Sequence, residues 1–266
     1  MNLSAALPAA CFAVANLEAL HIPAYAAIAI AGMIAALWLS LRTAPLRSLE
    51  PETLWDAGVF AIAAAFVLSR LLGLALFVVV EHGRLTLSLR DILSFSSISY
   101  LSLLVTAIPV ALWLRWKRLP LLRAMDAWAP CGALLWSALS LADAVSGTGG
   151  GLPTRLPWGV RAASSSVNTR VHPVALYSAA AALALCLALI ALLRRMREPG
   201  RVAAIAFIAS GTTLFLLDML RVPDQPQAQP LSHNLLDVSQ WIALAAVVFG
   251  ACLLAFIPRA RPQEVR

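Results

Sequence analysis

Residues 179–193 read AAAALALCLALIALL, fifteen consecutive positions without a charged side chain, and the pair Arg194 and Arg195 follows at once. The stretch lacks the alternation of period two that a membrane-spanning β-strand requires. A helix needs roughly 20 predominantly apolar residues to cross the hydrocarbon core of a bilayer. Extended back to its polar N-terminal boundary, the stretch reaches that length, so the sequence predicts a transmembrane helix over about 172–193.

The composition of the whole chain is equally apolar. Of its 266 residues, 61% are hydrophobic and 12% are charged, whereas soluble domains average about 45–50% apolar and about 25% charged residues. These values exclude a soluble enzyme and a basic nucleic-acid-binding domain, and the net charge of +7 is better explained by membrane topology. We predict an all-α, polytopic membrane protein, folded as a single transmembrane domain over residues 1–266, with no nucleic-acid partner.

Seven stretches are long and apolar enough to span a membrane. They cover residues about 22–42, 57–81, 92–114, 126–146, 172–193, 202–220 and 235–257. Lys and Arg gather in every second connection, which the positive-inside rule assigns to the cytoplasm. The N-terminus is then outside, the C-terminus is cytoplasmic, and the longest connection, residues 147–171, forms an extracytoplasmic loop.

Arg70 lies well inside the second predicted span, where neither membrane surface is within easy reach of its side chain. Placing an arginine near the bilayer centre costs about 2.5 kcal/mol or more, so the guanidinium requires a partner or a polar cavity. Two interpretations remain open. Arg70 forms an internal ion pair that holds helices together, or it belongs to an anion or lipid-headgroup site inside the bundle.

Other polar residues gather toward the outer ends of the spans. Asp143 is either a solvated end residue or part of the lining of a polar cavity. Asp218 and Arg221 are three residues apart on one helix face, where they form a local ion pair or take part in a site. His172 starts the fifth span, followed by Pro173, and either anchors the loop or acts as a general base, since its ordinary pKa is about 6.5.

Several cations with few carboxylates at one membrane face suit a phosphate-bearing lipid headgroup. Arg70, Arg170 and Arg221 supply the cations. Backbone N–H groups in the glycine cluster at 147 and 149–151 can also bind an oxyanion. The chain has no metal-ligand spacing, Walker loop or Ser-His-Asp arrangement, so we predict neither a metal nor a cofactor.

Motifs over about residues 20–258 resemble those of one known family. LPWGV at 156–160 is followed by HPVALY at 172–177. This order resembles the T-x-L-P-W and H-P-T-Q-L-Y-E motifs of bacterial prolipoprotein diacylglyceryl transferases. Further landmarks occur in the family's order, namely Tyr25, Arg70, Asp126 with Ala129-Pro130, Arg221-Val222-Pro223-Asp224, and Gln240.

The resemblance implies a seven-span enzyme of the bacterial cytoplasmic (inner) membrane with its site toward the outer face. It implies transfer of a diacylglyceryl group from phosphatidylglycerol to the lipobox cysteine thiol of a prelipoprotein, with release of glycerol phosphate. This reaction requires a base for the thiol and cations for the phosphate. We therefore predict His172, Tyr25 and Asp218 as catalytic residues, and Arg70, Asp143, Gly151, Arg170, Tyr177 and Arg221 as substrate-binding residues.

Several positions depart from the family's motifs. These are Leu101 for a His, Ser140 and Leu214 for Arg, Ser210 for a Tyr, and Thr148 and Ser178 for Glu. Loss of one transition-state donor can lower a rate by about 10²–10³. Three hypotheses follow: an active transferase that uses other residues, a relative that binds phospholipid or lipoprotein precursor without transfer, and a small membrane transporter or channel.

Overall fold

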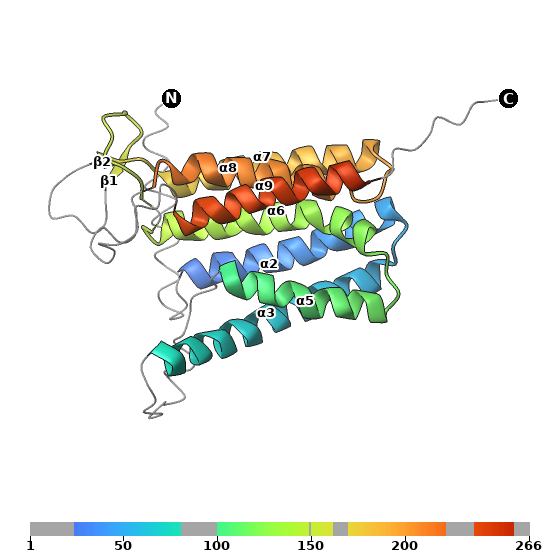
Figure 1. Ribbon diagram of the computed structural model, residues 1–266. Helices are drawn as coiled ribbons and strands as arrows, with labels where there is room; N and C mark the ends of the chain where they lie inside the picture. Colours follow the sequence, from blue (N-terminus) through green and yellow to red (C-terminus); the bar gives the residue numbers. More distant parts are fainter. Residues whose placement is uncertain (1–23, 81–99, 149, 162–169, 222–236, 258–266) are drawn as a thin grey trace.

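The computed structural model describes residues 24–80, 100–148, 150–161, 170–221 and 237–257. Long α-helices lie side by side, and a two-stranded antiparallel hairpin sits at one end of the bundle (Figure 1). In chain order the elements are α2 (Ala24–Thr43), η3 (Ala44–Arg47), α3 (Pro51–Val80), α5 (Tyr100–Trp116), α6 (Leu121–Val145), β1 (Val160–Arg161), β2 (Arg170–Val171), α7 (Val174–Arg195), α8 (Arg201–Asp218) and α9 (Val238–Phe256). The mainly helical prediction is confirmed.

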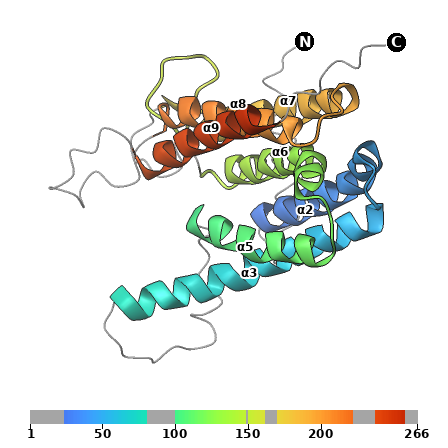
Figure 2. The same ribbon diagram turned by 45° about the vertical axis from the view of Figure 1, so that its right-hand side comes forward.

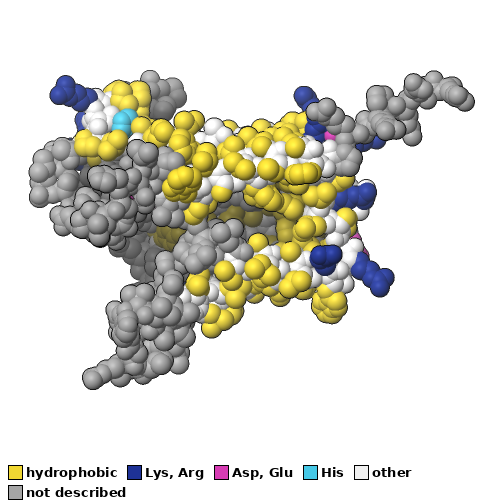
Figure 3. All heavy atoms as spheres, viewed as in Figure 1, with side chains coloured by type: hydrophobic (Ala, Val, Ile, Leu, Met, Phe, Trp, Pro, Cys, Tyr) yellow, Lys and Arg dark blue, Asp and Glu magenta, His cyan; other side chains and the backbone are white. Residues whose placement is uncertain are grey.

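Six helices of the described part are long and apolar enough to cross a membrane. A seventh, α5, has a shorter apolar segment, Val105–Trp116, and the third predicted span over 92–114 begins outside the described residues. Hydrophobic side chains cover the length of the bundle, while Lys and Arg lie at its ends (Figure 3). A polytopic membrane protein is therefore confirmed, whereas the seven-span count and the orientation of the termini stay predictions.

Several helices begin earlier or later than hydropathy predicts. α3 begins at Pro51 rather than near residue 57, because proline is well suited to the first helical turn and the polar residues that follow it remain helical. α6 likewise begins at Leu121, directly after Pro120. The placement of His172 at the start of the fifth span is corrected, since Pro173 is the N-cap and α7 begins at Val174, two residues after His172.

The main layer consists of α2, α6, α7, α8 and α9, which pack in the neighbour pairs α2–α6, α6–α7, α7–α8 and α8–α9. Glycines allow close helix approach at the α8–α9 interface. A Cβ at Gly211 would lie 2.5 Å from the carbonyl oxygen of Ala243, and one at Gly250 would lie 2.6 Å from that of Ala204. Side chains at these positions would therefore force the two helices apart.

α3 and α5 pack against each other and form a second layer that diverges from α2 toward the hairpin (Figures 1 and 2). The opposite end, which contains η3 and the α5–α6 connection, is held by a buried cluster of Ala44, Leu49, Leu54, Ala57, Leu114, Ala124 and Ala127. We call these two ends of the bundle the hairpin end and the η3 end. The second layer is thus attached to the main layer chiefly at the η3 end.

Candidate functional site

Backbone pairing brings three segments together at the hairpin end. Gly151 forms an antiparallel bridge with Arg221, and its N–H donates to the carbonyl oxygen of His172 at 2.8 Å. The N–H of Leu152 donates to the carbonyl of Leu220 at 2.9 Å, while its own carbonyl accepts from the N–H of His172 at 3.0 Å. Gly151 and Leu152 of the predicted loop are therefore fixed between the start of α7 and the end of α8.

Gly151 is buried at the centre of this pairing. A Cβ here would overlap the carbonyl oxygen of Leu220 and would lie 2.5 Å from Cγ2 of Val174. Glycine is required because the backbones approach so closely. Its N–H already donates to His172, so this group serves the packing of the loop and is not presented to an oxyanion.

Asp143, at the end of α6, interacts electrostatically with Tyr25 at the start of α2 and with Arg221 after α8. The Oγ1 of Thr148 donates to the Asp143 carbonyl oxygen at 3.1 Å and to its carboxylate at 3.4 Å. Asp143 is half-buried, and 41% of the Tyr25 surface is exposed. Asp143 thus interacts with two other predicted site residues from different parts of the chain, and we call Tyr25, Asp143 and Arg221 the hairpin-end cluster.

Asp218 has a different partner from the one that its spacing suggests. Its Oδ2 accepts a hydrogen bond from the Oγ of Ser239, in the first turn of α9, at 2.5 Å. The ion pairs within the described residues lie elsewhere, so the local Asp218–Arg221 pair is not formed there. The Asp218 carboxylate instead joins α8 to α9, and Arg221 is an exposed residue.

His172 lies in an aromatic group beside this cluster. The Nε1 of Trp158 donates to the Oη of Tyr177 at 2.8 Å, and the Tyr177 ring meets the His172 ring edge-on, with centroids 6.3 Å apart. The Nδ1 of His172 is buried and has no hydrogen-bond partner among the described residues. Because buried polar atoms are nearly always paired, this nitrogen is the atom of the group most suited to a substrate or water.

Two further predicted cations belong to other elements. Arg70 is half-buried on α3, with its guanidinium 5.1 Å from the centroid of the Phe66 ring, a distance typical of a cation–π contact. Arg170 is exposed on β2, and its carbonyl oxygen accepts from the N–H of Thr154 at 2.8 Å. Neither contact joins these arginines to the hairpin-end cluster.

Ser140 and Ser178, two of the departures from the family's motifs, are neighbours in space. Their hydroxyl oxygens lie 2.9 Å apart across the α6–α7 interface, where both residues are buried. The Oγ of Ser137 donates to the carbonyl oxygen of Ala179 at 2.8 Å in the same interface. From the sequence, the loss of the family's Arg at Ser140 and the loss of its Glu at Ser178 look unrelated. The only signal for their contact is that the two residues fall on consecutive predicted helices.

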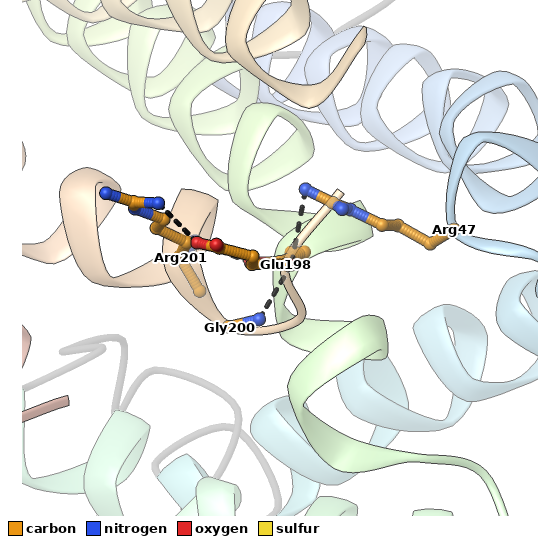
Figure 4. A network of polar contacts seen from close by, with 6 residues as sticks. Arg47, Glu198, Gly200 and Arg201 are labelled. Atoms are coloured by element: carbon orange, nitrogen blue, oxygen red, sulfur yellow. Dashed lines mark hydrogen bonds and ion pairs between the residues drawn. The ribbon is translucent and has the colours of Figure 1, made fainter. Parts of the chain in front are cut away.

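A second polar network lies at the η3 end (Figure 4). Arg47 and Asp126 are buried and form an ion pair at 3.3 Å. The Asp126 carboxylate also accepts from the N–H groups of Gly200 and Ala203, each at 2.8 Å. Asp126 therefore caps the start of α8 and ties it to α6 and η3. In the sequence, Asp126 stands out only as a carboxylate at the edge of an apolar run and as a landmark of the family resemblance, and neither feature predicts this role.

The fold and this cluster define a polytopic membrane protein that assembles polar side chains from several helices at one end of its bundle. The chain belongs to the prolipoprotein diacylglyceryl transferase family, whose sequence profile matches residues 13–256. The resemblance stated from the motifs is thereby confirmed, and the match extends over all of the helices described above.

Among curated relatives, all named phosphatidylglycerol–prolipoprotein diacylglyceryl transferase, the protein of Cupriavidus metallidurans is 31% identical over 131 residues. That alignment covers 49% of this chain and 47% of the relative, so the chain spans about half the length of that protein. The Leifsonia xyli relative is 28% identical over 88% of this chain and 74% of its own length. The Clostridium tetani relative is 24% identical over 88% and 93%, respectively.

Proposed function

We propose that this protein transfers a diacylglyceryl group from phosphatidylglycerol to the lipobox cysteine thiol of a prelipoprotein. The observation that carries the proposal is the electrostatic interaction of Asp143 with both Tyr25 and Arg221, in a chain of this family. The reaction takes place at the outer face of the cytoplasmic membrane. In this proposal the chain has seven spans, an outside N-terminus and a cytoplasmic C-terminus. The hairpin end then faces the outside.

In the proposed reaction the cysteine sulfur attacks the glyceryl carbon that carries the phosphate ester. A C–S bond forms, the C–O bond to phosphate breaks, and glycerol phosphate leaves with the bonding electron pair. The thiol proton passes to a base and finally to the released phosphate. An ordinary cysteine thiol has a pKa of about 8.5, so a base that removes its proton accelerates the attack.

His172 is the base that we propose. Its unpartnered Nδ1 can accept the thiol proton, while Tyr177 and Trp158 hold the ring in place. The family's own histidine position is Leu101 in this chain, which cannot accept a proton. His172 is the one histidine among the described residues, and its backbone pairs with Gly151, which in turn bridges to Arg221 of the hairpin-end cluster.

The cations bind the phosphodiester. Arg221 is exposed at the cluster and neutralises the charge that develops on the departing phosphate. Arg70 and Arg170 attract the anionic headgroup along its approach, and Tyr25 and Asp143 hold its glycerol hydroxyls through hydrogen bonds. Asp218 keeps α8 and α9 together beneath Arg221 through Ser239, and Gly151 lets the loop pack close to α8.

A second candidate function is binding of phospholipid or lipoprotein precursor without transfer. The Ser140–Ser178 contact favours it, because two serines satisfy each other where the family motifs carry Arg and Glu. This exchange removes a cation from the α6–α7 interface. A protein with this change can retain the lipid and still lack enough charge stabilisation for the leaving phosphate.

The deciding experiment gives the purified full chain phosphatidylglycerol and a lipobox-cysteine peptide in detergent. A gain of one diacylglyceryl unit in the peptide mass, with matching release of glycerol phosphate, supports transfer. A relative with all family motifs serves as the positive control. Retained phosphatidylglycerol without product, while the control is active, would replace the first function with the second.

A further inference from the structure

A strongly basic segment connects α5 and α6 at the η3 end, opposite the hairpin-end cluster. Residues 113–125 contain no Asp or Glu, and their four cations are Arg115, Lys117, Arg118 and Arg123. The next carboxylate along the chain, Asp126, is buried and bound to Arg47 and to α8. The ion pairs among the described residues leave these four cations unneutralised. We call this segment the basic turn.

Aromatic rings accompany the cations of the basic turn. The Nζ of Lys117 lies 5.6 Å from the centroid of Trp113 and 5.4 Å from that of Trp116. Trp113 stacks on Phe60 of α3, whereas 76% of the Trp116 surface is exposed. An exposed tryptophan beside cations at the end of a membrane helix is typical of the membrane–water interface. A ligand of this surface must therefore offer both apolar and negatively charged groups.

Arg118 adopts a conformation that side chains rarely tolerate. Its φ is +55°, in the left-handed region, and the following N–H, of Leu119, donates to the carbonyl oxygen of Leu114 at 2.9 Å to close the end of α5. Glycine is the residue that usually occupies this position after a helix. Ser48 adopts the same conformation, and the φ of Arg118 marks a position where glycine can replace the cation without strain.

We propose that the basic turn binds the headgroup of an anionic phospholipid in the membrane leaflet at the η3 end. Arg115, Lys117 and Arg118 contact the phosphate, and Trp116 lies against the upper part of the acyl chains. Charge complementarity favours this ligand because the segment has four cations and no carboxylate. The bound lipid would brace α5 where Leu114 joins the buried cluster that connects the two helix layers.

The test measures lipid binding to the purified full chain by native mass spectrometry. Phosphatidylserine is the probe because it is not the donor in the proposed transfer, and phosphatidylcholine is the neutral comparison. We expect wild type to prefer phosphatidylserine, and the double variant K117Q/R118G to lose about tenfold in affinity for it. The matched control, R194Q/R195Q, removes two exposed cations at the end of α7 and should change the affinity by less than about threefold.

The variant at Arg118 separates binding from folding. Replacement by glycine relieves the left-handed strain, so R118G should unfold at the same or a higher temperature than wild type while it binds phosphatidylserine less tightly. Equal losses in K117Q/R118G and R194Q/R195Q would overturn the proposal, since binding would then reflect total charge. Absence of any preference over phosphatidylcholine, or displacement of the lipid by millimolar inorganic phosphate, would overturn it as well.

Discussion

The hydroxyl groups of Ser140 and Ser178 share a hydrogen bond of 2.9 Å across the interface of α6 and α7, where both side chains are buried. The two serines stand at positions where the motifs of the family carry an arginine and a glutamate. Because Ser140 contacts Ser178, the arginine and the glutamate of the motifs are replaced together. Neither replacement therefore leaves the other's charge buried without a partner. This pairing makes the effect of restoring either charge predictable.

The variant S140R should lower the free energy of unfolding by about 3 kcal/mol, because it places an unpaired guanidinium in a buried helix interface. The double variant S140R/S178E should recover at least half of that loss, since the new charges can pair. Denaturation in mixed detergent, carried out as a double-mutant cycle, measures both values. Simple additivity of the S140R and S178E effects would contradict the expected pairing.

Removal of the Asp126 carboxylate should be among the most destabilising single changes. D126A leaves the Arg47 guanidinium buried without a partner and uncaps α8, so we expect a loss of about 3–5 kcal/mol in the free energy of unfolding. The ion pair Glu198–Arg201, which Figure 4 shows near Gly200, is the control. E198A should cost less than about 1 kcal/mol. A similar cost for both variants would show that Asp126 is not an anchor.

The adjacent glycines 150 and 151 should respond differently to alanine. G151A introduces a Cβ that overlaps the Leu220 carbonyl, so it should cost about 1–3 kcal/mol and displace the loop beside Arg221. At Gly150 the new Cβ would lie 3.5 Å from Val171, an ordinary contact, so G150A should be nearly neutral. Thermal unfolding and phosphatidylglycerol binding check both variants. Retained binding in G151A would show that the site does not depend on close packing here.

His172 should act on the rate of transfer and not on lipid binding. H172A removes the proposed base, so we expect product formation to fall by about 10²–10⁴-fold while phosphatidylglycerol affinity stays within about twofold. Y177F is the matched control. It loses the hydrogen bond from Trp158 but keeps the ring against His172, so its rate should change by only a few-fold. Undiminished transfer by H172A would exclude this residue as the base.

Arg221 should act on the phosphate. R221A should lower product formation by about 10²–10³-fold, because a cation at the departing phosphate stabilises the transition state. R221K keeps the charge but not the planar geometry, so it should recover part of that loss. Glycerol phosphate release at saturating peptide measures both rates. R161A, which removes an exposed arginine on β1, is the control and should remain active.

Part of the candidate site could be predicted from the sequence. The sequence predicts Asp143 and Arg221 toward the same face of the membrane, and they interact electrostatically because alternate ends of consecutive spans meet. Tyr25, which also interacts with Asp143, is predicted only by the family resemblance. The partner of Asp218 could not be predicted. Spacing along one helix suggests Arg221, but packing of α8 against α9 places Ser239 closer to the carboxylate.

The helical membrane architecture was determined by the sequence alone, because apolar length and charge are local properties that hydropathy measures directly. The tertiary structure alone decided which polar residues meet. Ser140 contacts Ser178, and Asp126 contacts Arg47, through helix faces whose rotation depends on side-chain packing along the whole interface. The close approach of Gly151 to Leu220 depends likewise on the path of a loop between two helices, and spacing in the chain does not encode that path.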